Sequence, residues 1–129
     1  MQRSQIKPQT NVCGTIIDSG ASTHMFGDKE DFGDLLPTSE VVFCANGTKT
    51  KATHQGFVDV NLEDGSVMHL QNVLRVPNLK KNLVSVRALN KDGNDVLFKR
   101  DGTVILTNNE SSRQIGHAIG DLYRVNIFQ

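Results

Sequence analysis

Turn-forming dipeptides that recur between short apolar runs constrain this chain more than any other feature of its sequence. Asn46-Gly47, Asp64-Gly65 and Asp101-Gly102 each separate two runs in which apolar residues tend to alternate with polar ones. Asn-Gly and Asp-Gly supply the positive φ angles that tight hairpin turns require, and alternation is typical of strands with one buried face. The pattern therefore predicts a succession of β-hairpins, with a type I′ turn at Asn46-Gly47.

The other segments fit the same plan, with one exception. Leu79, Leu83, Val86 and Leu89 are spaced to share a helix face, and Gly93 follows as a stop signal, which predicts a short helix. Single strands are predicted at residues 12–17, 96–98, 103–106 and 122–127. Hairpins are predicted at residues 41–56 and 57–76. About seven to nine strands and one helix predict a mainly β fold, a barrel or a sandwich.

The chain reads as one domain with a short leading arm. Residues 1–11 are polar and are predicted to form a flexible N-terminal arm, and residues 12–129 form the domain. The 14 basic and 14 acidic residues cancel, which argues against a surface for nucleic acid or for an anionic membrane. Two cysteines and the lack of a long apolar stretch favour a reduced, intracellular protein.

One carboxylate stands where an extended run meets a loop of small residues. Asp18 follows Ile17 and precedes Ser19, Gly20 and Ala21. A carboxylate at a strand end, next to a hydroxyl and a glycine, can lie low in a cleft where backbone amides approach it. The same residues are also ordinary in a turn, so the triplet alone is weak evidence of catalysis.

Longer motifs around this loop identify a family. The segments TIIDSGASTH at 15–24 and NVLRVPNLKKNLVSV at 72–86 resemble the aspartic protease of copia-type retrotransposon polyproteins. The resemblance runs from about residue 12 to 127. It implies a retropepsin-like fold, a closed β-barrel or sandwich with one short helix near 83–91, working as a twofold homodimer. About 35 residues follow the helix, and they either add strands to the dimer interface or pack beside the core.

The resemblance assigns roles to two groups of residues. Asp18 would be catalytic, in an active-site loop with Ser19, Gly20 and Ala21. A hairpin with its tip at Ala45, Asn46, Gly47 and Thr48 would be the flap that covers the substrate. Peptide hydrolysis of this kind needs two carboxyl groups, and the sequence holds one Asp-Ser-Gly, so each of two copies would contribute Asp18.

The activity so implied is that of an endopeptidase which processes a Gag-Pol polyprotein by water attack on peptide bonds. The substrate would be its own polyprotein, cut in the cytoplasm within virus-like particles, with no cofactor, metal, nucleic acid or membrane partner. One rival is a domesticated, non-catalytic module for dimerisation or peptide binding. A nucleic-acid-binding segment is a second rival, which the balanced charge disfavours.

Three other interpretations of individual residues carry low weight. Cys13, His24, Cys44 and His54 are too widely spaced for a zinc finger. Ser19 or Ser22 with His24 lacks the Gly-x-Ser-x-Gly elbow of serine hydrolases. Cys44 near the flap is a candidate redox-sensitive thiol, although such cysteines are more often simply buried.

Overall fold

The fold is mainly β, as predicted. The computed structural model describes residues 14–43, 47 and 49–128. A 3₁₀ turn, η2 (Lys29–Asp31), and a helix, α1 (Val86–Lys91), lie within these ranges. The strands are β1 (Thr15–Asp18), β2 (Met25–Phe26), β3 (Phe32–Pro37), β4 (Val41–Phe43), β5 (Lys49–Lys51), β6 (His54–Asn61), β7 (Val67–Arg75), β8 (Asn82–Ser85), β9 (Asp95–Phe98), β10 (Thr103–Thr107), β11 (Ser112–Ile119) and β12 (Leu122–Val125). Among these elements, no helix is long and apolar enough to cross a membrane.

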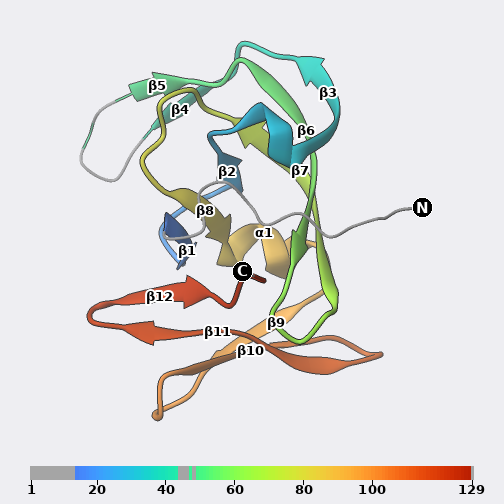
Figure 1. The fold of residues 1–129 in the computed structure, drawn as a ribbon. Coiled ribbons are helices and arrows are strands. Elements are labelled where there is room, and N and C mark those ends of the chain that lie inside the picture. Colours follow the sequence, from blue (N-terminus) through green and yellow to red (C-terminus); the bar gives the residue numbers. More distant parts are fainter. Residues whose placement is uncertain (1–13, 44–46, 48, 129) are drawn as a thin grey trace.

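Among the described residues, ten strands form one open sheet. Their order is β3-β6-β7-β2-β8-β1-β12-β11-β10-β9, and β4 and β5 form a separate hairpin. The expected closed barrel is wrong for the strands described, because the edge strands β3 and β9 do not pair. Figure 1 shows β3 in the upper part of the molecule and β9 in the lower part. The meander β9 to β12 extends the sheet beyond β1 and so carries its edge away from β3.

Two of the predicted Asp-Gly hairpin turns are confirmed. In the β6–β7 turn, Leu62 N donates to Ser66 O at 2.9 Å and Gly65 N donates to Leu62 O at 3.0 Å. Gly65, with φ of +88°, is the residue in the left-handed conformation of a three-residue hairpin loop. The β9–β10 turn repeats these bonds, and its Gly102 has φ of +94°.

The β4–β5 hairpin forms, but with a register one residue away from the predicted one. A regular two-residue turn at Asn46-Gly47 would pair Phe43 with Thr50, whereas Phe43 pairs with Lys49 and five residues separate the strands. In the observed register the buried Val42 pairs with Thr50, so Lys49 and Lys51 lie on the exposed face. The register of the turn signal would instead place Lys51 opposite Val42, toward the buried cluster.

The predicted helix is wrong over its first half. Residues 82–85 form β8, which pairs in parallel with β1 from Thr15 opposite Asn82 to Asp18 opposite Ser85. The helix begins only at Val86, where the Ser85 hydroxyl caps it by accepting from Ala88 N at 3.0 Å. Lateral pairing with β1, which no local pattern records, overrides the helical spacing of the leucines.

The segment after the helix completes the sheet around β1. Its last strand, β12, pairs antiparallel with β1, and Val104, Ile115 and Val125 enter the main core. Gly116 on β11 leaves room for the backbone of β12, because a Cβ at this position would lie 2.5 Å from Arg124 O. The C-terminal residues therefore extend the sheet beyond β1 and form part of the main core.

In the part of the chain that the structure describes, buried apolar residues form two clusters. The larger one lies within the main sheet and includes Phe26, Val58, Leu70 and Ile115. The smaller one contains Ala21, Met25, Val42, Ala52, Leu74 and Val76. Since Ala21 belongs to the loop after β1 and Val42 to β4, the smaller cluster ties that loop to the β4–β5 hairpin.

Candidate active site

Asp18 is the last residue of β1, with a strand on either side. β8 pairs with β1 in parallel and β12 pairs with it antiparallel. Asp18 is partly exposed, and its Oδ1 accepts a hydrogen bond from Gly20 N at 2.7 Å. Strand pairing thus fixes the backbone position of Asp18, and the hydrogen bond from Gly20 N orients its carboxyl group.

The loop that follows, residues 18–22 and called the acid loop here, is exposed at its tip and anchored at its base. Ser19 and Gly20 are exposed, whereas Ala21 is buried. A Cβ at Gly20 would lie 3.3 Å from Asp18 Oδ1, tighter than most such contacts, so glycine gives the carboxylate room beside the amide. Ala21 O accepts a hydrogen bond from the Ser85 hydroxyl at 2.7 Å, which joins the loop to the start of α1.

His24 lies beneath the acid loop and is fully buried. Its Nδ1 accepts a hydrogen bond from Ser85 N at 2.9 Å, so the neutral ring carries its proton on Nε2. Burial lowers the pKa of His24 from 6.5 to about 4, and the charge of Asp92 opposes this in part. The imidazole is therefore neutral near pH 7.

This placement bears on the interpretations that invoked His24. Ser19 and Ser22 are exposed while the His24 ring is buried and holds the Ser85 amide, so a nucleophilic Ser–His pair is not formed. Cys13 and Cys44, needed for the zinc and redox interpretations, lie outside the described residues. Within those residues, no group of three or more metal-ligating side chains gathers.

A cavity of about 490 Å³ opens beside Asp18. Its walls come from β1, from β8 with the residue before it, and from β12 with the turn before it. The lining residues are Ile16, Ile17, Asp18, Ser19, Lys81, Leu83, Asp121, Leu122 and Tyr123. Leu122, which lines the same cavity, is 45% exposed, so the cavity that Asp18 lines also presents an apolar side chain.

The β4–β5 hairpin, residues 41–51, is the segment that the resemblance assigns to the flap. Val42 packs inward into the cluster that contains Ala21, while Val41 and Phe43 point away from that cluster and are exposed. Gly47 is exposed with φ of +87°, and the other predicted tip residues, Ala45, Asn46 and Thr48, lie outside the described residues. The base of the hairpin is thus anchored beside the acid loop.

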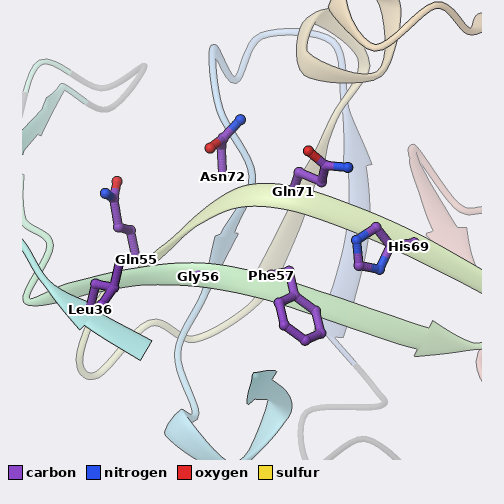
Figure 2. Close-up of a pocket in the computed structure, with 7 residues that line it drawn as sticks. All are labelled: Leu36, Gln55, Gly56, Phe57, His69, Gln71 and Asn72. Carbon is purple, nitrogen blue, oxygen red and sulfur yellow. The ribbon is translucent and has the colours of Figure 1, made fainter. Parts of the chain in front are cut away.

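A second cavity, of about 270 Å³, involves none of the predicted residues. Figure 2 shows its lining on β3, β6 and β7: Leu36, Gln55, Gly56, Phe57, His69, Gln71 and Asn72. The side chains of Gln55 and Asn72 project to one side of the two long strands and Phe57 to the other. The ring of His69 lies 5.2 Å from that of Phe57 and pairs with Asp59.

Sequence reasoning missed Ser85 and the role of His24. A serine directly before the helical run Val86 to Lys91 is a helix N-cap signal, and it points to Ser85 once the helix start is placed correctly. No local signal shows that the serine meets His24, because 61 residues separate them in the sequence.

Comparisons with known proteins relate the chain to the Pol region of retrotransposons. Residues 15–94, from β1 to just beyond α1, match the family described as Pol polyprotein, beta-barrel domain. The chain is 33% identical over 86 residues to a retrovirus-related Pol polyprotein from transposon RE1 of Arabidopsis thaliana. This match covers 64% of the chain but only 6% of that relative. No solved structure matches significantly.

Proposed function

Because the chain belongs to the Pol polyprotein β-barrel domain family, we propose that it is the aspartic endopeptidase of a retrotransposon polyprotein and acts as a homodimer. The observation that carries this proposal is the Asp18 carboxyl group, oriented by Gly20 N and open to a cavity of about 490 Å³. Its substrate would be an extended stretch of the polyprotein in which it is encoded, cut within particles in the cytoplasm.

The mechanism uses the two Asp18 side chains of a dimer as a pair. Two carboxyl groups about 3 Å apart cannot both be ionised, because their negative charges repel each other, so the pair shares one proton. The ionised carboxylate takes a proton from water as the water oxygen attacks the scissile carbonyl carbon. The protonated partner donates to the carbonyl oxygen, and collapse of the tetrahedral intermediate breaks the C–N bond as the amine receives a proton.

A single copy of the acid loop makes the second molecule necessary. The sequence contains one Asp-Ser-Gly and no Asp-Thr-Gly. If a twofold axis passes near Asp18, the exposed apolar groups around it become buried in the dimer. Leu122, 45% exposed, lines the Asp18 cavity, and Ile119, 41% exposed, pairs with Leu122 in the adjoining hairpin. Lys81 and Asp121, of opposite charge, line the same cavity and suit a self-complementary surface.

The flap hairpin supports binding of an extended peptide. Because Val42 belongs to the buried cluster that contains Ala21, the hairpin starts beside the acid loop. A hairpin in this place excludes water from the carboxyl pair and offers backbone groups to a substrate strand.

The activity is tested with the Asp18→Asn variant. The wild-type protein, incubated with an unstructured protein at mildly acidic pH, is expected to cut it, and a statine-like inhibitor should block cleavage. Asp18→Asn should abolish cleavage while leaving circular dichroism unchanged, whereas the control Asp95→Asn, at an exposed edge-strand position, should stay active. A wild-type protein that forms dimers but cuts nothing would instead be a dimerisation or peptide-binding module.

The dimer is tested separately with Leu122→Asp. Sedimentation is expected to show that this change shifts the protein toward monomer and that activity falls with it. Leu97→Asp is the matched control, since Leu97 is 55% exposed on the edge strand β9. A Leu122→Asp protein that remains an active dimer would show that the copies meet through another surface.

A further inference from the structure

The buried imidazole of His24 is a group that the proposed mechanism does not use. It is fully buried, and its Nε2 has no hydrogen-bond partner among the described residues. Leaving such a donor unpaired costs free energy, which a leucine or phenylalanine in the same place would avoid. The reason for a histidine in this place therefore lies with its other ring nitrogen, Nδ1.

That nitrogen begins a chain of hydrogen bonds that reaches the acid loop. His24 Nδ1 accepts from Ser85 N at 2.9 Å. The Ser85 hydroxyl donates to Ala21 O at 2.7 Å and accepts from Ala88 N at 3.0 Å. Ser85 also pairs with Asp18 in the parallel β1–β8 ladder. One residue, oriented by His24, thus joins the backbone around Asp18 to the first turn of α1.

Protonation of His24 would break the first bond of this chain. Nε2 already carries a hydrogen, so an added proton goes to Nδ1, which then becomes a donor facing the Ser85 amide, also a donor. The imidazolium charge would also be buried, and burial is the main reason why the pKa of His24 is lowered to about 4.

The ionisable groups on the neighbouring elements do not reverse this effect. Asp92, just past the end of α1, raises the pKa of His24, but by less than burial lowers it. Asp18 on β1 is bonded to Gly20 N, and Arg75 on β7 donates to Gly27 O at 3.0 Å.

We propose that His24 and Ser85 are positioning residues that hold the acid loop in its working geometry, and that protonation of His24 releases this hold and limits activity at low pH. The inference rests on the proposed endopeptidase function for its effect on activity. The coupling between His24 and the loop stands on the hydrogen bonds alone.

The test replaces His24 by asparagine, whose Oδ1 can take the place of Nδ1 as acceptor but does not titrate. The acid limb of the pH profile of kcat/KM is expected to move at least about one pH unit lower in His24→Asn, because proton uptake by His24 no longer contributes to it. His69→Asn is the matched control, since its side chain is 48% exposed, and its acid limb should coincide with that of the wild type. An unchanged acid limb in His24→Asn, with activity retained, overturns the inference.

Amide NMR gives a readout that does not need catalysis. Between about pH 3 and pH 7, the amide shifts of Ser85 and of Ser22, whose peptide group includes Ala21 O, should follow one titration in the wild type, which His24→Asn should lose. Ser85→Ala should keep the titration at residue 85 but weaken it at Ser22, because the hydroxyl bond to Ala21 O is gone. Coupled shifts without cleavage would refute the endopeptidase and leave the coupling standing, whereas cleavage without coupled shifts would refute the coupling.

Discussion

Acidification from neutral pH is expected to destabilise the fold through His24. Burial lowers the pKa of this residue from 6.5 to about 4 in the folded protein. Between these values the unfolded chain binds a proton that the folded chain does not, so the free energy of unfolding falls as the pH falls. At about 1.4 kcal/mol per pH unit, the full difference corresponds to about 3 kcal/mol, of which about 2 kcal/mol is lost by pH 5.

Carboxylates with lowered pKa values change the free energy of unfolding at lower pH than His24 does. Hydrogen bonds from Ser66 and Thr103 lower the pKa values of Asp64 and Asp101 below 3.8. Their stabilising effect is present above that value and is lost only as the pH falls through their folded pKa values, where His24 is already protonated.

The assay is urea unfolding followed by circular dichroism between about pH 7.5 and pH 4.5, with the wild type and the variant at the same protein concentration. The wild type should lose about 2 to 3 kcal/mol across this range, and His24→Asn, although less stable at neutral pH, should show a flatter dependence. Parallel curves for the two proteins would refute the reasoning, because the proton uptake would then belong to another group.

Three further predictions concern the packing around the site and are checked by the same unfolding assay. Gly116→Ala should cost about 1 to 3 kcal/mol, because a Cβ there would lie 2.5 Å from Arg124 O; an unchanged midpoint would mean that β11 and β12 can separate. Phe26→Ala should cost about 3 to 5 kcal/mol, since Phe26 is fully buried in the main core, and a loss below 1 kcal/mol would contradict that packing. Gly65→Ala should cost about 1 kcal/mol through its φ of +88°, whereas equal stability would indicate a rearranged turn.

The predictions that succeeded concern features governed by a few adjacent residues. The turns at Asp64-Gly65 and Asp101-Gly102 formed because their backbone angles and closing hydrogen bonds involve only neighbours in the sequence. The placement of Asp18 at the end of a strand was equally local, since an apolar β-branched run precedes it. The family resemblance and the matched family agree that the chain is related to a retrotransposon Pol region.

The predictions that failed concern contacts between distant segments. The apolar spacing from Leu79 to Leu89 fitted a helix, but β8 takes the middle of that segment because β1 offers it a partner strand. The β4–β5 register places Thr50 opposite the buried Val42 and keeps Lys49 and Lys51 exposed, and it does not follow the Asn46-Gly47 turn signal. The open ends of the sheet, at β3 and β9, depend on where the C-terminal meander packs.

The sequence by itself determined the β-rich class, two of the hairpin turns and the position of the acid loop, because each depends on interactions within about ten residues of chain. Only the tertiary structure decided that β12 and β8 flank β1, and that His24 and Ser85 meet. Such pairs lie 61 or more residues apart, so they form through burial and strand pairing that no local pattern specifies.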